Sequence, residues 1–118
     1  MIDEQELEEF GKAILTGVTV GLGSQVLLFG DKLSLIVQCP YRCNRLGIES
    51  WGHGENAKTS NLIFGFLNEK VESASCDSDG VLSIFFTGEK SISIVPEKDG
   101  LESYVLSSKY GISPVLMI

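Results

Sequence analysis

The sequence predicts an α+β fold in which an N-terminal helix packs on mostly antiparallel β-sheet, with a β-meander in the C-terminal half. Three observations support this class. Apolar residues recur at helical spacing near the N-terminus, they alternate with polar residues in the second half, and turn signals separate the alternating runs. The chain has 118 residues, 43% of them apolar. This is enough for one core, so we treat residues 1–118 as a single domain.

The first predicted element is a helix that begins after Asp3. Asp3 is a favoured N-cap residue, and Glu6 stands three residues later, where its side chain completes a capping box. Gly17 is expected to end the helix, because glycine readily adopts the left-handed conformation of helix C-termini. The apolar stripe that faces the core consists of Leu7, Phe10, Ile14 and Leu15.

A β-hairpin is predicted next. Its strands lie at 25–29 and 33–39, on either side of a turn at Gly30 and Asp31. Pro40 cannot donate a backbone hydrogen bond and is expected to end the second strand. The glycine-rich stretch at 21–24 is interpreted as the turn between helix and hairpin, because a phosphate-binding loop needs Gly-Lys-Ser/Thr at the start of a helix.

The middle of the chain lacks a clear period. From 41 to 59 we expect irregular structure, interrupted by a short strand at 46–51. Ser60 is then expected to cap a short helix. The apolar residues of that helix are Leu62, Ile63, Phe66 and Leu67.

The C-terminal half predicts a meander, and Asp79-Gly80 is a strong hairpin signal within it. Val81 and Leu82 compete for the core face of the strand after this turn. The predicted strands lie at 70–76, 81–86, 91–95, 101–107 and 113–118. The predicted core combines the helical residues Leu7, Phe10 and Ile14 with Leu82, Ile84, Phe86, Ile92 and Ile94.

The net charge of −7 is concentrated at the N-terminus and in the second half of the chain. Such a surface repels a phosphate backbone, so direct nucleic-acid binding is not expected. It attracts a basic protein and speeds their encounter. The alternative explanation is that the acidic surface serves only solubility.

We expect a cytoplasmic protein with free thiols. The N-terminus, MIDEQELEEF, is acidic, whereas a secretory signal is basic and then apolar. No run approaches the roughly 20 apolar residues of a membrane span. The three cysteines are an odd number, so they cannot all pair within one chain, and we expect all of them to be reduced.

The residues do not predict a catalytic or metal site. Cys39, Cys43, Cys76 and His53 form a ligand set that zinc accepts, but their spacing is unlike that of zinc knuckles. A nucleophile needs a base within hydrogen-bond reach, and the only histidine leaves Cys43–His53 as the one conceivable pair. No serine lies in a G-x-S-x-G elbow. We therefore expect no catalytic residues, no cofactor and no metal.

Candidate binding residues lie in two segments. Trp51 is either a core residue at a strand end, the commoner place for a large aromatic, or an interface anchor. His53 and Glu55 are flanked by glycines and are expected to be exposed, and a second acidic segment lies at the hairpin tip. The candidate partner-binding residues are Glu49, Trp51, His53, Glu55, Asp77 and Asp79.

The sequence resembles a family of small bacterial domains in residues 60–107. The matching pieces are NLIFGFLNEKVESA, DGVLSIFF, SISIVP and LESYVL, with Tyr104 where tryptophan is common. In size, acidity and predicted class the chain resembles immunity proteins of bacterial contact-dependent growth inhibition and related polymorphic toxin systems. The resemblance implies a cytoplasmic protein that binds one cognate toxin domain, often a basic nuclease, and blocks its active site.

Two other functions remain open. The chain is alternatively a homo-oligomeric structural or small-ligand-binding β module without catalysis, in which the apolar tail PVLMI pairs with a second copy as an exposed strand edge. An unrecognised enzyme is the third alternative.

Overall fold

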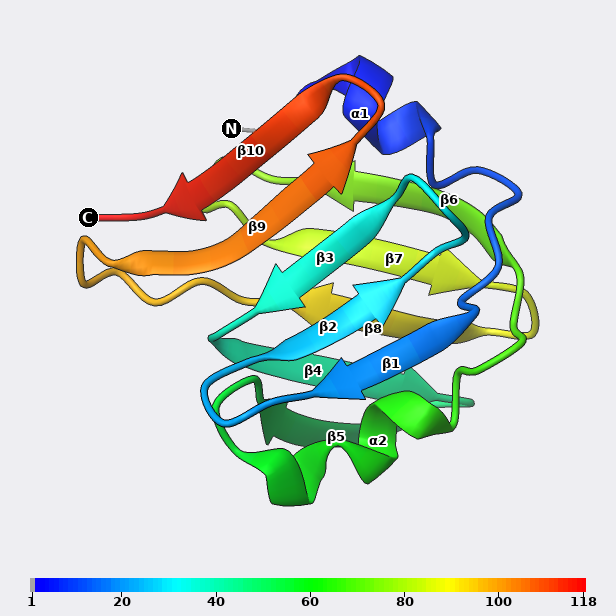
Figure 1. Ribbon diagram of the computed structural model, residues 1–118. Coiled ribbons are helices and arrows are strands. Elements are labelled where there is room, and N and C mark those ends of the chain that lie inside the picture. The colour runs from blue at the N-terminus through cyan, green and yellow to red at the C-terminus, as the bar shows by residue number, and fades with distance from the viewer. Residues whose placement is uncertain (1) are drawn as a thin grey trace.

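Two five-stranded antiparallel sheets lie face to face in the computed structural model, which describes residues 2–118 (Figure 1). In order of neighbours, the first sheet consists of β1 (Gly17–Val20), β2 (Gln25–Leu28), β3 (Ser34–Val37), β9 (Glu102–Ser108) and β10 (Gly111–Leu116). The second consists of β5 (Ile48–His53), β4 (Pro40–Arg45), β8 (Lys90–Ile94), β7 (Leu82–Phe86) and β6 (Val71–Cys76). The helices are α1 (Glu4–Glu8), η1 (Ala57–Thr59) and α2 (Asn61–Phe64).

The protein is mostly β. Strands account for 47% of the residues and helices for 10%, so the helical part is smaller than the predicted α+β class implies. The predicted antiparallel pairing of the strands is confirmed. None of the helices within residues 2–118 has the length and apolar character that crossing a bilayer requires.

The predicted start of the N-terminal helix is correct and its predicted end is wrong. Asp3 and Glu6 form the expected capping box, but α1 ends at Glu8 and Gly17 opens β1. Residues 12–15 instead form backbone hydrogen bonds with residues 68–71, at the start of β6. This extended pairing turns Ile14 outward, with 44% of its surface exposed, so its predicted burial is also wrong.

The predicted irregular segment 41–59 is largely a β-hairpin. Strands β4 and β5 pair over their full lengths, and the turn between them has left-handed backbone at Leu46 and Gly47. Pro40 opens β4 instead of ending a strand, a position where proline is tolerated because it needs no donor there. The pairing places the side chains of Tyr41 and Cys43 in the core.

The meander prediction holds for β6, β7 and β8, which are consecutive neighbours in the second sheet. After β8 the chain crosses to the first sheet, where β9 pairs with β3 on one side and β10 on the other. Residues 95–101 make this crossing at one end of both sheets. That end carries the candidate site described below.

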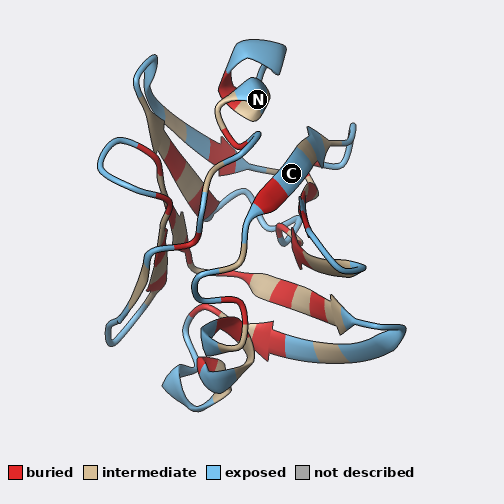
Figure 2. Ribbon diagram, turned by 90° about the vertical axis from the view of Figure 1, so that its right-hand side faces the viewer, coloured by how far each residue is buried: buried red, intermediate tan, exposed pale blue. Residues whose placement is uncertain are grey.

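One core fills the space between the sheets. Buried residues alternate with more exposed ones along the strands (Figure 2). In β7, Leu82 rather than Val81 takes the core position. The predicted core residues of the second sheet, Leu82, Ile84, Phe86, Ile92 and Ile94, are all confirmed as buried, as is Phe10. Leu7 is partly buried against this cluster.

The short helical segment before β6 differs slightly from prediction. Ser60 occupies the N-cap position of α2, but its hydroxyl donates back to the carbonyl of Ala57 and does not cap the helix. Ile63 and Phe66 are buried, whereas Leu67 is 39% exposed. The segment therefore covers one margin of the core with a single turn.

Candidate functional site

An acidic cavity lies where the chain crosses between the sheets. It measures about 240 Å³. Its lining residues belong to the segment after β5, to the crossing 95–101, to the start of β9 and to the connection between β3 and β4. Four of its lining residues are carboxylates: Glu55, Glu97, Asp99 and Glu102. All four are exposed, so each is available to a partner.

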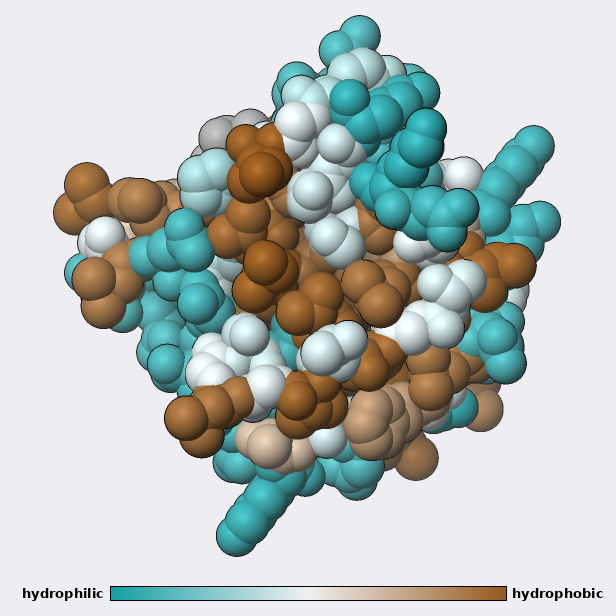
Figure 3. All heavy atoms as spheres, in the orientation of Figure 1, coloured by the Kyte–Doolittle hydropathy of each residue, from teal (hydrophilic) through white to brown (hydrophobic). Residues whose placement is uncertain are grey.

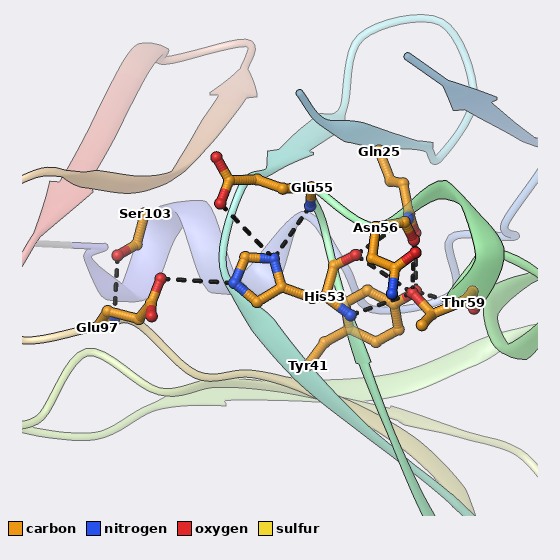
Figure 4. Close-up of polar contacts among 8 residues, drawn as sticks. All are labelled: Gln25, Tyr41, His53, Glu55, Asn56, Thr59, Glu97 and Ser103. Carbon is orange, nitrogen blue, oxygen red and sulfur yellow. Dashed lines mark hydrogen bonds and ion pairs between the residues drawn. The ribbon is translucent and has the colours of Figure 1, made fainter. Parts of the chain in front are cut away.

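His53 lies between two of these carboxylates (Figure 4). Its Nε2 is 3.6 Å from Glu97 Oε1, and its Nδ1 is 3.9 Å from Glu55 Oε1. The backbone N–H of Glu55 donates to Nδ1 at 3.1 Å, so a neutral imidazole carries its proton on Nε2, facing Glu97. The ring thereby connects the end of β5 to the crossing segment.

A buried polar network holds the segment that carries His53 and Glu55. The Tyr41 hydroxyl lies 2.8 Å from Gln25 Oε1 and 2.9 Å from Thr59 Oγ1. The Gln25 amide donates to the carbonyls of His53 at 3.1 Å and Asn56 at 2.9 Å. Because both Tyr41 and Gln25 are fully buried, these bonds fix the loop from inside the protein.

The two glycines around His53 are required by close packing. A Cβ at Gly52 would lie 2.5 Å from the Tyr41 ring, and one at Gly54 would lie 2.0 Å from the carbonyl oxygen of Val37. Neither glycine has a left-handed backbone. The glycines in SWGHGEN therefore indicate a tightly packed strand end, where irregular structure was predicted from the sequence.

The hairpin tip lies at the same end of the molecule as the cavity. Lys98 Nζ, in the crossing segment, is 3.3 Å from Asp79 Oδ1, and Gly80 packs against Pro96. The Asp77 carboxylate accepts hydrogen bonds from the N–H groups of Asp79 and Val81, so it shapes the turn. Both aspartates are exposed. This end of the protein, which we call the acidic end, contains Glu55, Asp77, Asp79, Glu97, Asp99 and Glu102, with Lys98.

Glu49 and Trp51 lie apart from the acidic end, on the outer face of β5. Trp51 is 51% exposed, so the expectation of a core role is wrong. Its Nε1 donates to Glu49 Oε1 at 2.8 Å, and the Arg42 guanidinium lies 5.7 Å from the ring centroid. The alternation along β5 sends Trp51 outward because Gly52 and Ser50 face the inner positions of β4, opposite Tyr41 and Cys43.

Cysteine chemistry is disfavoured by burial. Burial raises the pKa of Cys39 and of Cys43 to about 12, and it also raises the pKa of Cys76. Thiols in this state are poor nucleophiles and poor metal ligands. Cys43 faces the core while His53 lies at an outward position of the next strand, so the two do not form a catalytic pair. Within residues 2–118, no three Cys, His, Asp or Glu side chains converge in a metal-binding arrangement.

Comparison of the chain with protein-family models, with curated proteins and with solved structures finds no match. Interpretation of the site therefore depends on its own geometry.

A separate groove of about 410 Å³ lies between α1 and β6. It also contains three carboxylates, Glu4, Glu8 and Glu72. The acidic end differs from it because a buried network supports its loop and because two loops and a hairpin tip converge there. We therefore take the acidic end as the candidate site and use the groove as a comparison.

Glu97, Asp99 and Glu102 were not among the candidates predicted from the sequence. Glu97 and Asp99 fall in the connection between the predicted strands 91–95 and 101–107, where three consecutive charged residues stand at 97–99. That charge density was the available signal. The sequence did not show that this turn would meet His53, because the meeting results from the crossing of β9 into the other sheet.

Proposed function

We propose that this protein is an immunity-type inhibitor that binds a basic toxin domain, such as a nuclease, through its acidic end. The observation that supports the proposal is the convergence of six carboxylates on one end of the molecule, four of them around a cavity. A nuclease active site is lined with cationic side chains that hold a phosphate backbone. Carboxylates offer those side chains the same charge-assisted acceptors.

The support beneath the cavity favours tight binding. Ordering a loop during association costs about 0.5–1.5 kcal/mol per immobilised side chain. Here the loop from His53 to Thr59 is already fixed by Gln25 and Tyr41. An inhibitor with a fixed acidic surface therefore loses less free energy on binding than one with a flexible loop.

The test is binding and growth rescue with a candidate toxin domain taken from the genes adjacent to this protein's gene, where the proposal expects one. The variant Glu55→Gln/Glu97→Gln/Asp99→Asn removes three charges from the acidic end. Its matched control, Glu4→Gln/Glu8→Gln/Glu72→Gln, removes three charges from the groove between α1 and β6. Removing one partner of a desolvated charge pair costs about 2–5 kcal/mol, so we expect at least a 30-fold rise in Kd for the first variant and loss of rescue.

The control variant should retain tight binding and show at most a slower association rate, because it lowers only the overall attraction. Equal weakening by both variants would assign the effect to net charge. Binding lost only in the control would place the interface at the groove. Adding Glu49→Ala to the series tests the outer face of β5 in the same assay.

A further inference from the structure

The outer face of the first sheet is apolar. The strand register aligns Val26, Ile36 and Val105 in one row across β2, β3 and β9. In the next row, Leu28 and Ile112 lie on either side of Ser34 and Ser107. Each of these side chains is half-buried or exposed, and Ile112 is 73% exposed. Figure 3 shows apolar residues gathered over the middle of this face, with residues of intermediate hydropathy among them and hydrophilic residues mainly around them.

The outer face of the second sheet is different. The corresponding rows of β6, β7 and β8 contain Ser75, Ser83 and Ser93, and Ser73 and Ser91 lie in the next row with Phe85. Both sheets bury their inner faces in the same core, so packing within the molecule explains neither outer face. A polar outer face is the usual state of an antiparallel sheet in water. The apolar outer face of the first sheet is therefore the one expected to be an interaction surface.

We propose that the apolar face of the first sheet packs against the same face of a second copy to form a two-fold homodimer. The chain carries a charge of −7, so two copies repel each other wherever carboxylates meet. The rows of the apolar face contain no charged side chain. No residue is charged at 25–28 in β2, at 34–37 in β3 or at 105–107 in β9, and β1 and β10 contain no charged residue at all. A basic partner, in contrast, finds no carboxylate in these rows.

Carboxylates flank both ends of this face. The acidic end adjoins the end near Gln38 and Ser103, and α1, with Glu8 and Glu9, lies beside the opposite end, where β9 turns into β10 (Figure 1). The contact between two copies is therefore centred on the uncharged rows between these ends.

Face-to-face packing is favoured over pairing along the edge of β10. That edge contains Pro114, which has no N–H to donate to a neighbouring strand. Five strands about 4.8 Å apart and about five residues long give each face roughly 400 Å² of planar area. When the unevenness of the side chains is included, the area that two such faces bury together approaches the lower limit of about 1,000 Å² for a specific interface. The dimer is therefore expected to be reversible and to dissociate on dilution.

Sedimentation velocity of the full chain, from low micromolar to submillimolar concentration, tests the proposal. The wild type should shift from monomer to dimer across this range. Val105→Lys and Ile112→Lys should each raise the dimer Kd at least tenfold, about 1.4 kcal/mol, although each substitution changes the net charge from −7 to −6 and so reduces the general repulsion between copies. Ser75→Lys makes the same charge change on the exposed outer face of the second sheet and should leave the Kd unchanged.

Circular dichroism and thermal melting establish that each variant is folded, and Ile112→Lys lies at an exposed edge position where folding tolerates it. A wild type that stays monomeric at every concentration overturns the proposal, as does a dimer that both face variants leave intact. If the wild type is monomeric and Val105→Lys loses toxin binding, the apolar face of this protein is instead the surface that binds the toxin. The sedimentation experiments contain no toxin, so their result on dimerisation is independent of the inhibitor proposal.

Discussion

The hydroxyl of Tyr41 is the residue-scale feature on which the candidate site depends most. It is fully buried and contacts Gln25 and Thr59, which in turn hold the backbone of His53 and Asn56. Tyr41→Phe leaves the ring in place over Gly52 but removes the partner of a buried amide oxygen. A buried polar group without its partner costs about 1–3 kcal/mol.

We therefore expect Tyr41→Phe to lower the free energy of unfolding by about 1–3 kcal/mol, measured by urea denaturation. Amide hydrogen exchange in residues 53–59 should accelerate more than exchange in β7 and β8. Tyr110→Phe is the matched control, because Tyr110 is 52% exposed, and it should change stability by less than about 0.5 kcal/mol. Equal stability of Tyr41→Phe and wild type would show that the network does not hold the loop.

At the element scale, the five-residue helix α1 is too short to be stable alone, so its attachment to the sheets decides its order. Glu6 supplies that attachment. The residue is 5% exposed, and its carboxylate accepts hydrogen bonds from the Asp3 N–H at 3.1 Å and from the Ser113 hydroxyl of β10 at 2.6 Å. The same side chain thus closes the capping box and fastens the helix to the first sheet.

Glu6→Ala removes both bonds, and we expect a loss of about 1–3 kcal/mol of stability. Hydrogen exchange should rise throughout residues 4–11 and remain slow in the central strands. Glu8→Ala is the control, since Glu8 is exposed in the same helix. Unchanged exchange in α1 after Glu6→Ala would mean that Phe10 and Leu7 hold the helix without the carboxylate.

The sequence predicts elements well where alternation and turn signals agree. In β8 the apolar residues alternate strictly, in β7 only Phe85 interrupts the alternation, and Asp79-Gly80 marks the turn before β7, so both strands and their core residues were predictable. Strand β4 was not, because its inward residues are Tyr41 and Cys43 and its first residue is Pro40, a residue more typical of strand ends. Strand β1 has only four residues and follows a segment with helical spacing.

At the scale of the whole molecule, the site depends on long-range topology. Glu55, Asp79 and Glu97 come from three separate segments that meet only because the chain changes sheets after β8. The sequence identified Glu55 and Asp79 as candidates from their local surroundings. It could not group them with Glu97, and it also placed Glu49 with Glu55, although the register sends Glu49 to a different surface.

The buried thiols affect the stability of the whole protein at alkaline pH. Burial raises the pKa of Cys39 and of Cys43 from 9.0 to about 12 in the folded state. Below pH 9 both states keep these protons, so the stability is fully present. Above pH 9 the unfolded chain loses protons that the folded chain retains, and the free energy of unfolding falls.

The expected fall between pH 9 and 10 is about 2 kcal/mol for the two thiols together, from the linkage of about 1.4 kcal/mol per pH unit at each site. Urea denaturation at a series of pH values under reducing conditions measures it. The variant Cys39→Ala/Cys43→Ala starts from lower stability but should show a shallower pH dependence. Parallel curves for variant and wild type would contradict this assignment.

The crossing of β9 into the first sheet also governs the order in which the chain can fold during its synthesis. Strand β3 pairs with β9 in the register Ser34 to Ser107, so one edge of β3 waits for a partner made more than 60 residues later. At ribosomal rates of about 5–20 residues per second, that edge stays open for several seconds. During this interval the nascent β1–β3 segment presents an unpaired edge together with the apolar side chains of β2 and β3, and shielding by a ribosome-associated chaperone would matter most at this stage.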